Sequence, residues 1–267
     1  MKQDHLSCPT NTSVELSELR LRDALALLEH GSMSHSPNAE EGGLAYLQKI
    51  IDGLCEISLR DPLTGLFNRR YFDSILAKEI GHVARSGNLA LLLLLDIDHF
   101  KKINDQHGHL AGDQVLQAVS RCISSCVRPR DTVARYGGEE FAVILPDCKA
   151  DYAGFVAERI RKKLAELNIQ ISPALQLQVT VSIGGAFAPM WVRSTADLWI
   201  ESADTQLYRA KAEGRNRVCI TLPQILSVSA EEKSMLFQPS TGPTPAWLDP
   251  TDDATTIPPI EENKDAP

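Results

Sequence analysis

Four carboxylates in this 267-residue chain stand where they could form one reactive site. Asp96 and Asp98 close an apolar run, and Glu139 and Glu140 follow a pair of glycines. Carboxylate oxygens are hard ligands of the kind that hold Mg²⁺ and, through it, nucleotide phosphates. If a hairpin at the glycines lies beside the strand that carries the aspartates, the four acids converge, and this convergence indicates phosphoryl transfer.

The first acidic pair follows Leu89–Leu95, an apolar stretch too short to span a membrane. We interpret this stretch as a buried strand. Residues two apart in a strand share a face, so Asp96 and Asp98 are expected side by side, where a cation would offset their crowded charge. Taken alone, such a pair is more often a loop cap than a ligand set.

The second acidic pair lies between two β-rich segments, Thr132–Tyr136 and Phe141–Leu145. The glycines Gly137 and Gly138 predict a tight hairpin turn, because glycine adopts positive φ without steric cost. Exposed acids beside a hairpin commonly do no more than solvate it. This motif alone therefore supports a structural role and a chemical role equally.

Several separated blocks of the sequence carry a family signature when they are read together. The acidic motifs lie within Asp96–His109, Gly112-Asp113 and Gly137–Phe141, and the supporting blocks are Asp61–Arg70, Ser182–Gly184 and Ala203–Asn216. From Leu59 to Ile220 the chain resembles the GGDEF-type diguanylate cyclases, in the GGEEF variant, with no departure at the signature positions. Blocks that match in order and spacing are a stronger signal than any single short motif.

The resemblance implies a reaction in which two GTP molecules condense to cyclic di-GMP and release two pyrophosphates. Each 3′-hydroxyl attacks the α-phosphorus of the other nucleotide, and each subunit holds one GTP. Two half-sites must therefore face each other in a homodimer or higher oligomer. The implied role is that of a cytoplasmic signalling enzyme that uses Mg²⁺ or Mn²⁺ and controls biofilm formation against motility.

The resemblance also gives roles to the acidic residues. Asp96, the Ile97 carbonyl and Glu139 would be metal ligands, and Glu140 would be a second-metal ligand or its support. The metals would draw charge from the triphosphate and orient the attack. Glu139 is also the implied general base, although one carboxylate does not easily serve as both tight ligand and efficient base.

Four further residues are implied to hold the phosphates. Phe100 and Lys101 follow the Asp96 strand in an expected tight loop, whose backbone N–H groups would face the β- and γ-phosphates while Lys101 neutralises charge. Lys211 and Arg215, one helical turn apart, would grip the phosphates as well. If the resemblance is set aside, Lys101 is interpreted as a solvated lysine, and Lys211 and Arg215 are interpreted as an ordinary charged helix end.

Guanine selection falls, by resemblance, to Asn104 and Asp113, and His109 would line the substrate. An Asn amide meets the O6 or N3 edge of guanine, and an Asp carboxylate accepts from N1–H and N2–H₂, a donor pattern that adenine lacks. Asn104 would alternatively cap the helix that follows it. His99, His107 and His109 lie close to the aspartates in sequence, so a transition-metal site of imidazoles and carboxylates is a weaker alternative.

A regulatory site is implied as well. Arg128-Pro-Arg-Asp131 resembles the family's RxxD product-inhibition site, in which Arg128 and Asp131 would grip cyclic di-GMP through guanine edges or phosphates. The spacing alone is weak, and its placement shortly before the glycine pair carries the inference. Arg159 would complete the site from the next helix, with a solvated helical arginine as the alternative.

Composition and charge limit the cellular compartment and the classes of partner expected for the protein. Six cysteines without a C-x-x-C pair, and no signal-peptide pattern, predict reduced thiols in a cytoplasm. No stretch is long enough to cross a membrane. Of the formal charge of −8, the segment from Thr221 onward carries −6, from eight acids and two lysines. The rest is nearly balanced, which excludes a basic surface for nucleic acid.

Three parts are expected along the chain. Residues 1–58 form a helical regulatory and dimerisation region, 59–220 the catalytic domain, and 221–267 a disordered, acidic, proline-rich tail. Within the first part, a helix is predicted at 14–30 and a linker at 31–43.

Four apolar residues before the catalytic domain form a predicted a/d seam, namely Leu44, Leu47, Ile51 and Leu54. Two heptads are short for an independent coiled coil. The seam therefore either pairs two protomers, under control of a partner protein that binds the first helix, or packs on its own domain.

The catalytic part is predicted to have an α+β fold, with a mixed, largely antiparallel central sheet flanked by helices, similar to the palm domains of nucleotidyl cyclases and polymerases. The hairpin requires antiparallel strands, which disfavours a doubly wound sheet. Helices are predicted at 69–85, 110–127, 150–167 and 195–213, and strands at 89–97, 132–136, 141–145, 178–187 and 217–220.

Two functions of different class follow from the sequence. The first is an active cyclase, and the second is a catalytically silent receptor for GTP or cyclic di-GMP. An intact set of Asp96, Lys101, Glu139 and Glu140 favours the cyclase, because a pure receptor has no need of metal ligands.

Overall fold

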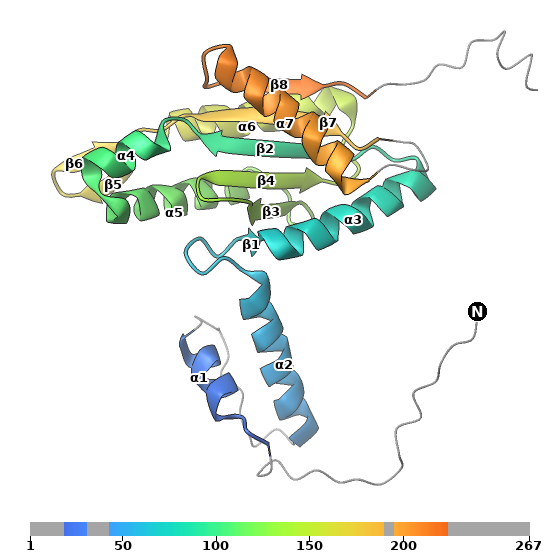
Figure 1. Ribbon diagram of the computed structural model, residues 1–267, viewed down its shortest axis with the longest axis vertical. Helices are drawn as coiled ribbons and strands as arrows, with labels where there is room; N and C mark the ends of the chain where they lie inside the picture. The colour runs from blue at the N-terminus through green and yellow to red at the C-terminus, as the bar shows by residue number, and fades with distance from the viewer. Residues whose placement is uncertain (1–18, 31–42, 190–194, 224–267) are drawn as a thin grey trace, which may run out of the picture. The chain divides into compact units, whose positions relative to one another are not determined.

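The computed structural model describes residues 19–30, 43–189 and 195–223 (Figure 1). Its helices are α1 (Arg22–His30), α2 (Gly43–Leu59), α3 (Arg69–Ser86), α4 (Phe100–His107), α5 (His109–Ser125), α6 (Ala150–Ala165) and α7 (Ala196–Ala212). Its strands are β1 (Phe67–Asn68), β2 (Leu91–Ile97), β3 (Thr132–Arg135), β4 (Glu140–Leu145), β5 (Ile169–Ser172), β6 (Leu175–Leu177), β7 (Val181–Phe187) and β8 (Val218–Thr221).

The central sheet has six strands in the order β1-β3-β4-β2-β7-β8. The inner strand β2 runs antiparallel to both β4 and β7, and β3 runs antiparallel to β4. Only the outer pairs, β1 with β3 and β7 with β8, are parallel. The predicted α+β fold with a mixed, mostly antiparallel sheet is confirmed.

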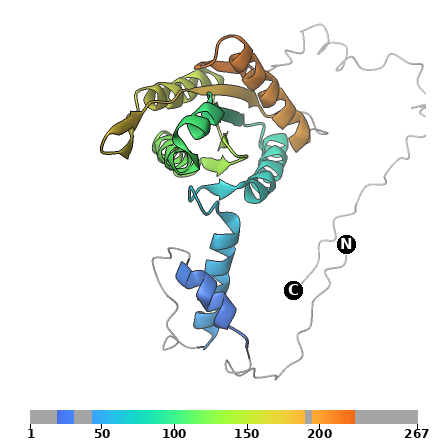
Figure 2. The ribbon, with the colours of Figure 1, turned by 60° about the vertical axis from the view of Figure 1, so that its left-hand side comes forward.

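Helices cover both faces of this sheet (Figures 1 and 2). Leu91, Leu93 and Leu95 pack with buried residues of α5 and α6, whereas Leu92 and Leu94 pack with α3 and α7. Every residue of β2 is buried, which explains why the strand is a continuous apolar run rather than an alternating one. The prediction of a buried strand before Asp96 is therefore confirmed.

A close contact between β7 and α7 fixes the distance between the sheet and this helix. A Cβ added at Gly184 would lie 2.1 Å from the backbone nitrogen of Leu207 and 2.4 Å from the carbonyl oxygen of Ala203. Both atoms belong to the main chain of α7, so no side-chain rotation would relieve the overlap. Glycine at this position lets the C-terminal end of α7 reach the end of β2.

Four elements lie outside the predicted set. α4 occupies residues expected to form a loop, and β1 and the small antiparallel pair β5–β6 were not predicted. In α4 only Phe100 is buried, so the segment has no apolar period that would mark a helix.

The hairpin between β3 and β4 forms as predicted, but not for the predicted reason. Gly137 and Gly138 lie outside the set of glycines with positive φ. A Cβ at Gly137 would lie 2.4 Å from Oε2 of Glu140, so a side chain there would displace the end of the Glu140 side chain. The expectation of a left-handed glycine turn is wrong, and Gly137 leaves room for the Glu140 carboxylate in its present position.

The described N-terminal residues form two helices. Leu28 of α1 and Ile50 of α2 are buried, whereas Leu44 and Ile51 of the predicted seam are 85% and 53% exposed. The seam residues Leu47 and Leu54 are half-buried. Most of the predicted linker and tail, at residues 31–42 and 224–267, lies outside the described residues, and among the described helices none is long and apolar enough to span a membrane.

Candidate active site

Strand pairing brings the acidic motifs together. In the antiparallel register Asp96 of β2 lies opposite Glu140 of β4 on one side and Ser182 of β7 on the other. The backbone N–H of Ile97 donates a hydrogen bond of 3.3 Å to the carbonyl oxygen of Glu139. The strand pairing therefore places the end of the Asp96 strand beside Glu140, the first residue of β4, and beside the turn that carries Glu139.

Asp96 is neutralised by a lysine from α7. The Nζ atom of Lys211 lies 2.7 Å from Oδ2 of Asp96, and the Asp96 side chain is only 10% exposed. Burial raises the pKa of Asp96, while the hydrogen bond and charge of Lys211 lower it and the nearby Asp98 raises it again. The ion pair thus offsets part of the cost of keeping this carboxylate charged in the fold.

Glu139 lies in the same electrostatic environment. Burial raises its pKa first, the charge of Asp96 raises it further, Lys211 lowers it, and Glu140 raises it. Asp96 and Glu140 thus disfavour the ionisation of Glu139, and Lys211 is the cation that favours the charged form of both Asp96 and Glu139. The site attracts additional positive charge.

Asp98 has a structural role that the sequence did not reveal. Its carboxylate accepts hydrogen bonds from the hydroxyls of Thr180 at 2.6 Å and Ser182 at 2.7 Å, and from the backbone N–H of Asn216 at 3.0 Å. It is 6% exposed. Asp98 therefore ties β2 to β7 and to the turn after α7. The sequence predicted that a cation would offset the charges of Asp96 and Asp98 together, but at Asp98 three hydrogen-bond donors do so instead.

Arg215 lies in that turn and not on the helix. α7 ends at Ala212, and both Arg215 and Asn216 have positive φ, of 63° and 43°. The expectation that Lys211 and Arg215 sit one helical turn apart is therefore wrong. The charge of Arg215 still lowers the pKa of Asp96, so the two basic residues reach the same carboxylate from different backbone conformations.

The acidic turn is held by Arg135, a residue that the sequence argument did not single out. Its guanidinium donates to the carbonyl oxygen of Gly138 at 2.8 and 3.2 Å and forms an ion pair of 3.2 Å with Asp61. Asp61 belongs to the first block of the family signature. That block was the signal in the sequence that Asp61 has a role near the site. Arg135 is thus a positioning residue for Glu139.

The residues implied in guanine binding lie on α4 and α5. Asn104 is inside α4 rather than at a helix N-terminus, so the alternative of an N-cap is wrong. Its Oδ1 atom is buried, has no hydrogen-bond partner among the described residues, and would lie 2.0 Å from a Cβ added at Gly112. Asp113 is half-buried on α5, and His109 is exposed at the first position of that helix.

The residues at the start of α4 differ in exposure. Phe100 is 6% exposed and packs in the core, whereas Lys101 is exposed to solvent. His99, which precedes the helix, has a left-handed backbone with φ of 60° and no side-chain capping bond. The predicted loop is therefore a turn of two residues, Asp98 and His99, followed directly by helix.

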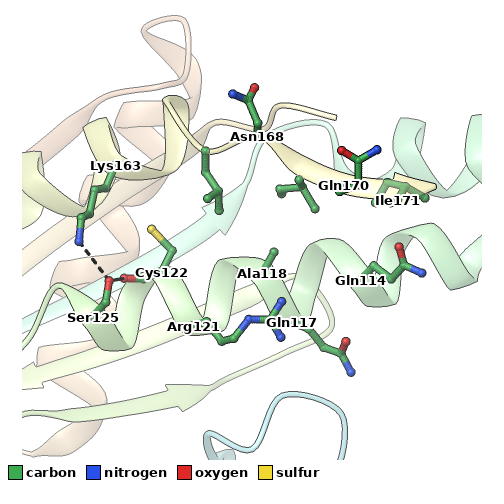
Figure 3. A pocket seen from close by; sticks show the side chains of 12 residues that line it. Gln114, Gln117, Ala118, Arg121, Cys122, Ser125, Lys163, Asn168, Gln170 and Ile171 are labelled. Atoms are coloured by element: carbon green, nitrogen blue, oxygen red, sulfur yellow. Dashed lines mark hydrogen bonds between the residues drawn. The ribbon is translucent and has the colours of Figure 1, made fainter. Parts of the chain in front are cut away.

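A groove of about 670 Å³ lies away from these residues, between α5 and the segment that leads into β5 (Figure 3). Arg121, Lys163 and several amide side chains line it, and Lys163 donates to the hydroxyl of Ser125 at 3.3 Å. It contains no residue that the sequence implied in catalysis or in product binding. Its size alone does not make it the candidate site.

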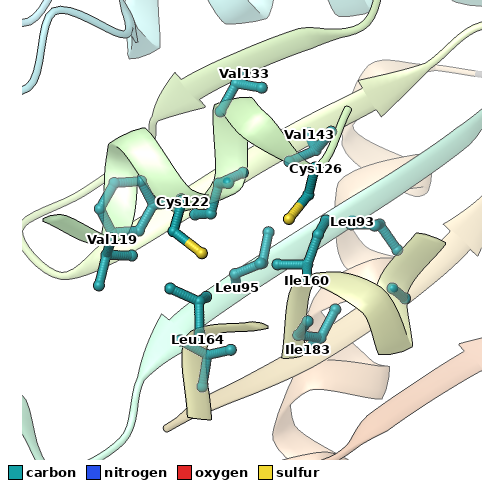
Figure 4. Close-up of a cluster of buried hydrophobic side chains, with 14 of the residues drawn as sticks. Leu93, Leu95, Val119, Cys122, Cys126, Val133, Val143, Ile160, Leu164 and Ile183 are labelled. Carbon is teal, nitrogen blue, oxygen red and sulfur yellow. The ribbon is translucent and has the colours of Figure 1, made fainter. Parts of the chain in front are cut away.

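The residues of the implied product site form a second cluster. Arg128 and Asp131 are joined by two hydrogen bonds. The backbone N–H of Arg128 donates to Oδ2 of Asp131 at 2.7 Å, and the backbone N–H of Asp131 donates to the Arg128 carbonyl oxygen at 2.9 Å. Arg159 of α6 donates to the carbonyl oxygen of Cys126, whose side chain lies in the core (Figure 4). Burial raises the pKa of Asp131, and its bond from Arg128 lowers it.

The side chains of the site limit which metal ion it could hold. Within residues 19–30, 43–189 and 195–223, no group of three or more His, Cys, Asp or Glu side chains is arranged to hold one. A transition-metal site built on the histidines therefore lacks a ligand set there. Asp96, Glu139 and the Ile97 carbonyl supply oxygen atoms only, and this chemistry fits Mg²⁺ or Mn²⁺ better than a softer metal.

Sequence comparison finds relatives over the same part of the chain. The family model described as diguanylate cyclase, GGDEF domain, matches residues 58–217. Diguanylate cyclase A of Treponema denticola is 42% identical over 171 residues, which cover 63% of this chain and 46% of that protein. The chain spans less than half the length of the curated relatives that it matches first.

Solved structures give the same result. Diguanylate cyclase SiaD of Pseudomonas aeruginosa, determined in complex with its activator SiaC, has a TM-score of 0.61 and 36% identity, over 66% of each chain. The GGDEF domain of DgcB from Caulobacter crescentus, in complex with c-di-GMP, has a TM-score of 0.58 and 38% identity, over 61% of this chain and 93% of that one.

Proposed function

Because this chain belongs to the GGDEF diguanylate cyclase domain family, we propose that it condenses two GTP molecules to cyclic di-GMP and releases two pyrophosphates. The observation that carries the proposal is that Glu139 lies beside the end of the Asp96 strand, with its carbonyl oxygen bonded to the Ile97 N–H and Lys211 2.7 Å from Asp96. A mere receptor for a nucleotide has no need to hold several mutually repelling carboxylates in one place.

Asp96, Glu139 and the Ile97 carbonyl would hold the divalent ion, with Glu140 as a further ligand or its support. Bound there, the ion would neutralise the triphosphate and orient the α-phosphorus for in-line attack. Lys101, exposed at the start of α4, and the pair Lys211 and Arg215 would hold the terminal phosphates with Phe100 at the base of the loop. The raised pKa of Glu139 suits the acceptance of a proton from the attacking 3′-hydroxyl.

Asn104 and Asp113 would recognise guanine, with His109 beside the nucleotide. The buried, unpaired Oδ1 of Asn104 supports this role, because a ligand N–H would satisfy it. Discrimination against adenine would be strong, since a purine without the matching donors leaves buried acceptors unpaired.

The reaction needs two nucleotides, and this set of residues would hold one. We therefore propose that catalysis takes place in a homodimer or higher oligomer, in which two such half-sites face each other. The exposed seam residues Leu44 and Ile51 on α2 supply a surface for pairing. A regulatory protein on the N-terminal helices is a further proposal, supported by the complex of the similar protein SiaD with its activator SiaC.

Arg128, Asp131 and Arg159 would bind the product and inhibit the enzyme. Their clustering supports this proposal, as does the cyclic di-GMP bound to the DgcB domain. In this account residues 1–58 regulate, 59–220 catalyse and 221–267 form a tail, in a cytoplasmic protein.

Incubation of the purified full chain with GTP and Mg²⁺, followed by chromatography of the nucleotides, tests the proposal. We expect cyclic di-GMP from the parent and from Glu201→Gln, which alters an exposed acid on α7, and none from Glu139→Gln. The specific rate should rise with protein concentration, because the active species is an oligomer. If the parent makes no product even when a fused coiled coil enforces dimerisation, the cyclase is refuted and retained nucleotide binding identifies a receptor.

A further inference from the structure

The turn after α7 has an unusual backbone conformation. Three consecutive residues have positive φ, namely Gly214 at 118°, Arg215 at 63° and Asn216 at 43°. Glycine adopts such angles without steric cost and asparagine tolerates them, whereas the Cβ of an arginine disfavours them. A strained backbone of this kind persists only where surrounding contacts hold it, and it is commonest at functional sites. The contacts of Arg215 and Asn216 therefore indicate what the turn is for.

The Arg215 side chain does not help to hold the fold. It is exposed to solvent, and in the part of the chain that the structure describes its guanidinium forms no ion pair and no hydrogen bond. Only its backbone is bonded, through the N–H to the Ala210 carbonyl at 3.0 Å and through the carbonyl to Nε of Arg217 at 3.3 Å. A guanidinium without an acceptor in the protein is available to an anionic ligand such as a phosphate.

Two residues from other elements hold Asn216, the next residue of the turn. Its backbone N–H donates to Oδ2 of Asp98 at 3.0 Å, and its side-chain Oδ1 accepts from Nη1 of Arg161 at 2.8 Å. Arg161 belongs to α6 and is itself oriented by Glu158, one turn earlier, through an ion pair of 2.9 Å. The Arg161 side chain is only 18% exposed. Asp98 thus fixes the backbone of the turn, and Arg161 fixes its side chain.

We propose that Arg161 is a positioning residue for Arg215. Through Asn216 it keeps the left-handed turn in the conformation from which Arg215 binds the terminal phosphates of the nucleotide. The inference rests on the proposed function, because these phosphates belong to the substrate of that reaction. Lys211 lies on α7 and is held by Asp96 at 2.7 Å, so Arg215 is the member of the basic pair whose place depends on the turn.

Arg161→Met removes the bond to Asn216 and keeps an unbranched side chain that suits a helix. Titration calorimetry of the full chain with a nonhydrolysable GTP analogue and Mg²⁺ should give a dissociation constant about tenfold higher than that of the parent, the effect of losing one hydrogen bond to a charged group. Asn216→Gly, which permits positive φ but lacks the acceptor, should weaken binding by a similar factor. Lys162→Met, at the exposed neighbouring position of α6, should leave the constant unchanged.

A double-mutant cycle separates positioning from a merely structural role. In an Arg215→Met background, Arg161→Met should cause no further loss of affinity, because the arginine that it positions is already gone. The inference is overturned if Arg161→Met binds the analogue as tightly as the parent, or if the two losses add in the double variant. Melting temperatures check that each variant is folded.

The binding measurement needs no turnover. A parent that binds the analogue without making product refutes the cyclase, and the cycle still decides the role of Arg161. A parent that binds no analogue overturns the inference as well.

Discussion

Removal of the Asp98 carboxylate is expected to destabilise the domain strongly. The carboxylate accepts from Thr180, Ser182 and the backbone of Asn216 at 2.6 to 3.0 Å. Hydrogen bonds to charged groups contribute about 1.5–3 kcal/mol each. Their simple sum overstates the loss, because deletion also removes the desolvation cost of a buried charge. We therefore expect Asp98→Ala to lower the free energy of unfolding by about 3–5 kcal/mol.

Asp98→Asn should be much milder, at about 1–2 kcal/mol. The hydroxyl of Ser182 rotates and can accept from the new amide group, whereas the N–H of Asn216 can only donate and would keep the remaining oxygen. Urea unfolding of the purified chain measures both changes, as a shift in midpoint at constant slope. Asp105→Ala, at an exposed acid on α4, is the matched control. If Asp98→Ala loses no more stability than Asp105→Ala, the three bonds do not hold β2 to the turn after α7.

Two further predictions concern packing and charge. Gly184→Ala should lower the free energy of unfolding by more than about 3 kcal/mol, because the new Cβ would overlap the main chain of α7. Gly154→Ala, whose new Cβ has no atom within 4 Å, should be neutral or slightly stabilising. Thermal unfolding of the two variants measures both changes. Binding of a nonhydrolysable GTP analogue with Mg²⁺ should weaken as the pH falls through the acidic range, since the raised pKa values of Asp96 and Glu139 make both acids take up protons at a higher pH than ordinary carboxylates. Lys211→Ala removes the cation that lowers both pKa values and should move the midpoint of this loss to higher pH, and an unchanged midpoint would contradict the proposed coupling.

The strands of the site were predictable because their residues carry a local signal. Five consecutive leucines before Asp96 indicate a strand buried on both faces, and the β-rich segments around Gly137 and Gly138 indicate a hairpin. The weak alternation in β5 and β6 was missed because these strands are only four and three residues long.

The contacts that position the site were not predictable, because the partners are far apart in sequence. Asp98 and Asn216 are separated by 118 residues, and Arg135 and Asp61 by 74. A sequence pattern reports which residues lie on a face, but it does not report which donor will reach a given carboxylate. The reason given for the glycine pair failed in the same way, since Gly137 does not have a positive φ and its close neighbour is the Glu140 carboxylate, which no local pattern reports.

Three positioning devices act on the same small region, and together they explain how it tolerates its charge. Gly184 lets α7 approach the sheet, Asp98 ties the turn after α7 to β2, and Arg135 holds the turn that carries Glu139. Each fixes one of the elements that contribute an acid or a base to the site. Without them the carboxylates would separate and their pKa values would relax toward those of solvated acids. The raised pKa values of Asp96 and Glu139 are therefore a consequence of this scaffold, and they mark the place where an added cation would bind most favourably.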